Sequence, residues 1–149
     1  MPDNTSLIKD LENLWATDFP LNRSMQLSIK DYQPRSLRTF APLVGNTNTH
    51  NTAFAGSLYA LQALSAWGLI WLELKVAGID ASIIHARGDI KFPAPLTTDI
   101  QMQTQWPDAA DALEQLTKKG RIKFELAVSA AEPQAEPSST FSGVYVVRL

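Results

Sequence analysis

The sequence predicts an α+β domain in which a curled, mostly antiparallel sheet is wrapped around one long apolar helix. Residues 52–72 contain no charged side chain and are apolar on every face. A helix of that kind is surrounded by its own protein or inserted in a membrane. After Gly78, apolar and polar residues alternate in four stretches, which is the period of strands covered on one face only. The sheet must curl, because a flat sheet could not cover every face of the helix.

The central helix is expected to run for about 25 residues, or roughly 38 Å. Asn51 or Thr52 is expected to cap its start, because a short side-chain oxygen accepts from the free amides of the first turn. Gly78 is expected to end it in a left-handed conformation. The stretch is long enough to span a membrane. We favour a buried helix, because the predicted strands need a packing partner.

An amphipathic helix is expected over residues 5–18, where apolar residues recur at helical spacing. Thr5 or Ser6 is its expected cap, and Pro20 ends it. Residues 1–22 are thus an N-terminal helix and lead-in. A half-buried strand is expected over residues 25–29, because apolar and polar side chains alternate there.

A turn or bulge at Pro34 and a returning strand over 37–41 complete the part before the central helix. The strands after the helix are expected near residues 84–92, 100–106, 121–128 and 141–147. A short helix around Leu113 and Leu116, ended by Gly120, is expected between the second and third of these. In the first, the alternation places His85, Arg87, Asp89 and Lys91 together on a polar face.

Length and composition favour a single domain, residues 1–149. The formal net charge of -2 gives no indication of nucleic-acid binding. The chain has no cysteine, which excludes disulfides and thiol nucleophiles, and its two histidines, His50 and His85, make a metal site unexpected. The polar, acidic N-terminus lacks the features of a signal peptide, so we expect a cytoplasmic protein.

Residues 46–78, the predicted active-site loop and central helix, begin NTNTHNTAFAGSLYALQALSAWG. This arrangement resembles the hotdog fold of acyl-thioester enzymes, from about Met25 to the C-terminus. It is most similar to a small bacterial thioesterase-like group, which also occurs fused to acetyltransferase domains and whose pattern is N-x-N, T-x-F-G-G-S-L-Y-A-L and W-G. The matching positions are Asn46, Asn48, Thr52, Phe54, Gly56, Ser57, Leu58, Tyr59, Ala60, Leu61, Trp67 and Gly68, and Ala55 replaces the first paired glycine.

The resemblance implies a homodimer, with further association to a tetramer left open, that binds the pantetheine arm of coenzyme A or acyl carrier protein in a tunnel at its interface. No cofactor is implied beyond that arm, which belongs to the substrate. The thioester carbonyl is expected at the start of the long helix, where free amides stabilise charge on oxygen. The amides of Ala55 and Gly56 are the candidates for this role.

Asn48 is the main polar candidate, because an amide can donate to an oxyanion or orient a water but cannot act as a base. A loop asparagine can also simply satisfy local backbone groups. Asn46 either holds the loop or contacts substrate. Thr52 and Ser57 are candidate substrate contacts or packing groups, and Phe54 is a further candidate contact because it belongs to the shared pattern.

The expected helix carboxylate is missing. Related thioesterases of the 4-hydroxybenzoyl-CoA type carry an Asp or Glu about two turns into the helix, where this chain has Ala63 beside Gln62. Glu73 lies roughly 15 Å farther along. His50, in the loop, is the remaining candidate base. Arg87 and Lys91 either form a solvated face or meet a coenzyme A phosphate or an acidic carrier protein.

Decarboxylation of a malonyl thioester needs no nucleophile, only stabilisation of the enolate oxygen and an apolar environment for the carboxylate. The resembled group includes malonyl-acyl-carrier-protein decarboxylases, which make acetyl thioester to prime fatty acid synthesis. We therefore predict this reaction. The alternatives are a coenzyme A or acyl-carrier-protein thioesterase that uses His50 or a positioned water, and a non-catalytic acyl-thioester binding module.

Overall fold

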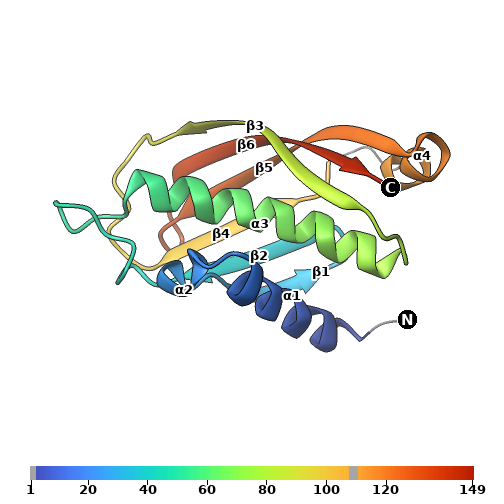
Figure 1. Cartoon of the computed structure of the whole chain (residues 1–149). Coiled ribbons are helices and arrows are strands. Elements are labelled where there is room, and N and C mark those ends of the chain that lie inside the picture. The colour runs from blue at the N-terminus through green and yellow to red at the C-terminus, as the bar shows by residue number, and fades with distance from the viewer. Residues whose placement is uncertain (1–2, 108–110) are drawn as a thin grey trace.

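A computed structural model describes residues 3–107 and 111–149, and shows one long helix lying against a curled sheet (Figure 1). The helices are α1 (Asn4–Asp18), α2 (Asn22–Met25), α3 (Ala55–Val76) and α4 (Ala112–Lys119). The strands are β1 (Ser28–Gln33), β2 (Ser36–Ala41), β3 (Ser82–Lys91), β4 (Ile100–Gln105), β5 (Arg121–Ala131) and β6 (Pro137–Arg148). The predicted fold class is confirmed.

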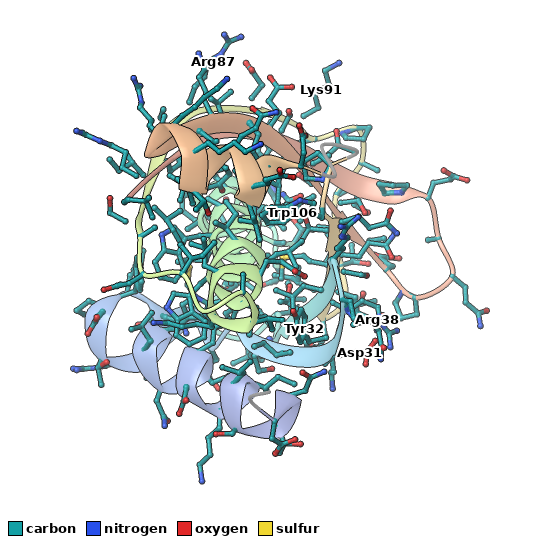
Figure 2. The ribbon with its side chains drawn as sticks, turned by 90° about the vertical axis from the view of Figure 1, so that its right-hand side faces the viewer. Asp31, Tyr32, Arg38, Arg87, Lys91 and Trp106 are labelled. Carbon is teal, nitrogen blue, oxygen red and sulfur yellow. The ribbon has the colours of Figure 1, made fainter. Side chains whose placement is uncertain are left out.

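The six strands form one sheet in the order β1-β2-β4-β5-β6-β3, and every pairing is antiparallel. The end-on view shows the strands curving over α3, while α1 lies along the opposite side (Figure 2). The helix α3 contacts β2, β3, β4, β5 and β6 as well as α1. β1, the first strand before α3, and β3, the first strand after it, form the two edges of the sheet, so the curled sheet covers one side of α3 and α1 contacts it as well.

The helix α3 is long and apolar enough to cross a membrane, and half of its most apolar window is buried within this fold. Its contact with α1 is close. A methyl group added at Gly68 would lie 2.5 Å from the ring of Trp15, which is fully buried. The buried half of this window thus packs inside the protein, in agreement with the buried helix that we favour over a membrane span.

Both predicted N-caps are wrong. The start of α1 is capped by Asp3, whose side chain accepts from the amide of Thr5. The helix α3 begins at Ala55, its N-cap position is Phe54, and it has no side-chain cap. The prediction for the other end of α3 is confirmed: Gly78 has φ +70°, and the amides of Gly78 and Ile79 donate to the last turn.

The first strand starts later than the alternation of residues 25–29 predicts. Residues Asn22–Met25 form the short helix α2, and Gln26 takes a left-handed conformation after it. The side chain of Asn22 is buried and accepts from the amide of Leu27 across 2.9 Å. This local hydrogen bond holds a turn where the apolar pattern predicts a strand.

A β-bulge in β3 removes His85 from the predicted polar face, while Arg87, Asp89 and Lys91 stay on it. The pairing with β6 steps from His85–Tyr145 to Arg87–Val144, which leaves Ala86 without a partner position. One extra residue reverses the side on which the following side chains lie. His85 therefore faces the helix side with Ile83, whereas Ile84 is 45% exposed and lies on the outside.

Candidate functional site

The segment before α3 is a folded loop closed by backbone bonds. Thr47 and Ala53 form an antiparallel bridge, and the amide of Phe54 donates to the carbonyl of Asn46. The amide of Ala53 donates to the carbonyl of Leu96, in the loop after β3. These bonds hold the start of α3 beside residues 92–96.

Asn48 organises the inside of this loop. Its Oδ1 accepts from the amides of His50 and Thr52, across 2.9 and 3.2 Å. Its Nδ2 donates to the Thr52 hydroxyl across 2.8 Å and to the carbonyl of Ala53 across 3.4 Å. The last of these bonds is long and correspondingly weak. One amide hydrogen of Asn48 is thus firmly held, and the other is held loosely.

The start of α3 presents free amides. Its first intrahelical bond runs from the amide of Leu58 to the carbonyl of Phe54, so the amides of the preceding residues have no partner within the helix. Ala55 and Gly56 are exposed there. The Phe54 ring lies over Gly56, where an added methyl group would come within 2.4 Å of it. Close approach of this ring therefore requires glycine.

A cavity of about 340 Å³ lies between the helix start and the loop after β3. Its described lining residues are all uncharged: Asn48, Thr52, Ala53, Ala55, Leu58, Phe92, Pro93, Ala94, Pro95 and Leu96. The arrangement offers hydrogen-bond donors at a helix start beside apolar side chains. It can stabilise negative charge on an oxygen, and its described walls supply no general base.

The predicted site residues are only partly brought together. Asn48, Thr52 and Ala55 line this helix-start cavity, and Gly56 and Ser57 lie next to it in the first turn. His50 is exposed at the tip of the loop and is not part of the cavity lining.

Asn46 is 1% exposed, and its Nδ2 donates to the carbonyls of Met25 and Pro42. Its contacts support the loop-holding alternative rather than contact with substrate.

Arg87 and Lys91 project from the outer side of β3, away from α3 (Figure 2). Arg87 pairs with Asp89 across 3.4 Å, and both side chains are 72% exposed. An exposed pair of this kind contributes little to stability. The structure therefore places these two cations on the solvated face, outside the lining of the helix-start cavity.

Glu73 lies far from the helix start, as predicted, and its carboxylate contacts other groups. It is buried, and its Oε1 accepts from the Tyr32 hydroxyl across 3.2 Å and from the amide of Arg35. Burial first, and then the charge of Glu73, raises the pKa of Tyr32. Glu73 thus fastens the β1–β2 turn to the far part of α3.

A second cavity, the apolar cleft, was not predicted from the sequence. Its volume is about 470 Å³. It lies between the α1–α2 connection and α3, and it is lined by Asp18, Phe19, Pro20, Leu21, Met25, Tyr59, Ala60, Ala63, Leu64, Trp67, His85 and Tyr145.

The Tyr59 hydroxyl and His85 Nε2 lie 3.0 Å apart in the apolar cleft. Burial lowers the pKa of His85, and the backbone of Val144 opposes that shift only in part. Tyr59 belongs to the shared pattern, but the bulge that turns His85 toward it leaves no signal in the alternation.

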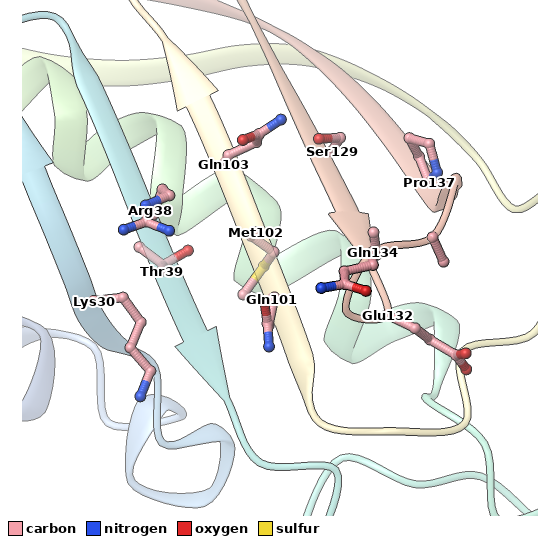
Figure 3. A pocket seen from close by; sticks show the side chains of 12 residues that line it. Lys30, Arg38, Thr39, Gln101, Met102, Gln103, Ser129, Glu132, Gln134 and Pro137 are labelled. Carbon is pink, nitrogen blue, oxygen red and sulfur yellow. The ribbon is translucent and has the colours of Figure 1, made fainter.

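A third cavity, of about 290 Å³, lies over β1, β2, β4 and the β5–β6 loop, where Lys30, Arg38 and Glu132 are among the lining residues (Figure 3). Arg38 also pairs with Asp31 across 3.6 Å. Charges of both signs and three glutamines line this surface. It shares no lining residue with the helix-start cavity.

The fold and the helix-start site define a hotdog protein of the thioesterase-like class. Residues 8–149 match the model of the YiiD_C family, described as "Putative thioesterase (yiiD_Cterm)". The chain belongs to this family.

Solved structures agree with this assignment. "The putative thioesterase from Shewanella oneidensis" is 29% identical, with a TM-score of 0.88 over 97% of this chain and 99% of that one. A protein of unknown function from Chlorobaculum tepidum is 28% identical, with a TM-score of 0.86 over 94% and 93% of the two chains. A "Probable Thioesterase" from Pseudomonas aeruginosa is 20% identical and shares the fold, with a TM-score of 0.83 over 99% and 97%.

Proposed function

We propose that this protein decarboxylates a malonyl thioester, carried by acyl carrier protein or coenzyme A, to the acetyl thioester at the start of α3. The observation that carries the proposal is the helix-start cavity: Ala55, in the first turn of α3 with its free amides, lines it, and its described lining is uncharged. Such a site suits a reaction that develops charge on one oxygen and needs no base.

The reaction balances without a co-reactant other than a proton. The bond between the malonyl carboxylate and C2 breaks, and carbon dioxide leaves. The electron pair stays on the thioester as an enolate, and a proton from solvent then adds to C2. The amides of Ala55 and Gly56 would hold the enolate oxygen, and an apolar wall would favour loss of the charged carboxylate.

Asn48 has a specific part in this proposal. Its Nδ2 hydrogen toward the carbonyl of Ala53 spans 3.4 Å and is the weaker of its two bonds. A small turn of the side chain would give that hydrogen to the enolate oxygen while the bond to Thr52 is kept. The loop would then hold a third donor beside the two backbone amides.

A homodimer is part of the proposal, because the site of this fold class is completed by a neighbouring subunit. β3 forms one edge of the sheet, and on its other side no strand of the described chain pairs with it. It is ten residues long and carries the exposed side chain of Ile84. An unpaired edge of this length is a ready surface for pairing with another strand. We propose acyl carrier protein or coenzyme A as the partner, because one of the two carries the proposed malonyl thioester.

Hydrolysis of an acyl thioester is the second candidate, and the family description favours it. A hydrolase must activate a water. His50 lies outside the helix-start cavity lining, so a positioned water is the form of this alternative that the arrangement supports better.

Product analysis separates these functions. Purified protein is incubated with malonyl-coenzyme A and malonyl-acyl-carrier-protein, with acetyl and longer acyl thioesters as controls, and products are followed by mass spectrometry. Acetyl thioester from the malonyl substrates, with little free thiol, is the expected result. Free thiol from several substrates would show that the protein hydrolyses thioesters and does not act as a decarboxylase. No product from any of them would indicate the binding module.

A further inference from the structure

The apolar cleft runs beside α3 from Tyr59 to Trp67, a rise of about 12 Å along the helix axis. It begins one turn after the helix start. Leu58 lines the helix-start cavity and its neighbour Tyr59 lines the cleft, so the two cavities border the same turn of α3 from different sides. A malonyl group is far too short to fill both. The proposed malonyl substrate therefore does not account for the cleft.

The polar groups of the cleft are concentrated at one place. Tyr59 and His85 hydrogen-bond to each other across 3.0 Å. Tyr145 also lines the cleft, but its hydroxyl donates to the carbonyl of Ala63 across 2.8 Å. Elsewhere the walls are mostly apolar, with the exposed Asp18 at the rim.

The backbone makes room for this pair at two positions. The bulge at Ala86 turns His85 inward. At Gly88, an added methyl group would come within 2.3 Å of the Tyr59 hydroxyl. A tyrosine hydroxyl and a histidine placed on an apolar wall are costly unless they find partners. The bulge at Ala86 and the absence of a side chain at Gly88 thus both make room for the hydrogen-bonded pair of Tyr59 and His85.

The pair can either donate to a ligand or accept from it. When Tyr59 donates to His85 Nε2, the phenol oxygen keeps a lone pair for a ligand. When Nε2 carries the hydrogen and donates to that oxygen, the phenol hydrogen is free to donate. His85 Nδ1 is buried without a hydrogen-bond partner in the described structure. The pair can therefore match a hydroxyl or a carbonyl oxygen on an otherwise apolar ligand.

An acyl chain fits these walls better than a pantetheine arm does. The arm carries two amide groups, and each would need hydrogen-bond partners that the cleft provides only at Tyr59 and His85. An alkyl chain needs none, and it gains from burial along Ala63, Leu64 and Trp67. The apolar cleft thus matches the chain of an acyl thioester whose carbonyl lies at the helix start.

We propose that the apolar cleft receives an acyl chain of medium length, and that the Tyr59–His85 pair favours chains with a hydroxyl or oxo substituent. The inference rests on the proposed binding of a thioester at the start of α3, but not on the reaction that follows. It names a second class of ligand for that site, namely oxygenated acyl thioesters longer than malonyl.

The test is binding of coenzyme A analogues in which a methylene separates sulfur from the carbonyl, so that no acyl transfer occurs. Affinities are measured by calorimetry for the acetyl, octanoyl, 3-hydroxyoctanoyl and 8-hydroxyoctanoyl analogues. The octanoyl analogue should bind at least tenfold more tightly than the acetyl analogue. One hydroxylated analogue should bind about fivefold more tightly than octanoyl, the effect of one hydrogen bond.

Variants test which residues cause the preference for a hydroxyl group and the preference for a longer chain. Tyr59→Phe should abolish the hydroxyl preference and keep the preference for length. Ala63→Leu, or Ala60→Leu if the first variant does not fold, should abolish the preference for length. Ala77→Leu, at the exposed C-terminal end of α3, is the matched control and should change neither.

Three results would overturn the inference: equal affinity for acetyl and octanoyl analogues, a hydroxyl preference that survives Tyr59→Phe, or a change from dimer to monomer in Ala63→Leu. The last would show that a second copy covers the cleft. If the preferences for length and oxygen are found but malonyl thioesters are not decarboxylated, only the proposed reaction fails.

Discussion

The side-chain amide of Asn48 donates to the hydroxyl of Thr52 across 2.8 Å, inside the loop that leads into α3. The same side chain accepts from the amides of His50 and Thr52. Asn48 is therefore both a structural element of the loop and the polar side chain with a loosely held hydrogen beside the free helix amides. The two roles can be separated by substitution.

Asn48→Asp keeps the acceptor oxygen for the two loop amides but replaces the donor nitrogen. We expect kcat for malonyl decarboxylation to fall about a hundredfold, the usual cost of losing one oxyanion donor, with little change in melting temperature. Asn48→Ala should lose as much activity and also some stability. Asn13→Ala, on the exposed face of α1, is the control. Unchanged kcat in Asn48→Asp would remove this residue from the reaction.

Glu73 is predicted to matter for stability and not for chemistry. Glu73→Ala leaves the Tyr32 hydroxyl and the Arg35 amide without their acceptor, which should lower the free energy of unfolding by about 2–4 kcal/mol. Glu73→Gln keeps an acceptor and should cost less. Urea denaturation measures both. Glu114→Ala, which breaks an exposed pair with Lys118, should cost at most about 0.5 kcal/mol. Equal losses in Glu73→Ala and Glu114→Ala would refute the role of the buried contact.

His85 is expected to make the free energy of unfolding depend on pH. Its pKa is lowered in the folded protein, so below about pH 6.5 the unfolded chain binds more protons than the folded one. Stability contributed by neutral His85 is thus complete above that pH and is lost as pH falls toward the folded pKa. Urea unfolding at pH 7.5 and pH 5.0 should show a smaller loss in His85→Asn than in the native protein.

We expect a charge on the edge strand β3 to disrupt the proposed dimer. Ile84→Glu places a carboxylate on an exposed position of the unpaired edge. We expect light scattering to show the proposed dimer for the native protein and a monomer for this variant. Val44→Glu, at a position that is 79% exposed in the loop after β2, is the matched control and should stay dimeric. A dimeric Ile84→Glu would place the interface elsewhere.

Much of the fold follows from periodicity. The uncharged stretch at residues 52–72 predicts a wrapped helix, and the alternation after Gly78 predicts four strands. Both predictions hold because burial of apolar side chains decides these elements. The turn at Pro34 and the helix ended by Gly120, which has φ +74°, are also confirmed. Each follows from the backbone preference of a single residue.

What the sequence does not reveal depends on single hydrogen bonds and one extra residue. The short helix α2 depends on the bond from Leu27 to Asn22, and the inward position of His85 depends on the bulge at Ala86. Neither has a periodic signature. The residues around the helix start could be grouped as a candidate site because they are close in sequence. The apolar cleft could not, because it joins α1, α3, β3 and β6.

The most direct test of the proposed reaction follows the fate of the malonyl carboxylate. A malonyl thioester labelled with carbon-13 in its free carboxyl group is given to the native protein. We expect the label to be released as carbon dioxide, in equal amount to the acetyl thioester formed, and we expect Asn48→Asp to slow both together. Label recovered in free malonate, in equal amount to free thiol, would show hydrolysis and contradict the proposed decarboxylation.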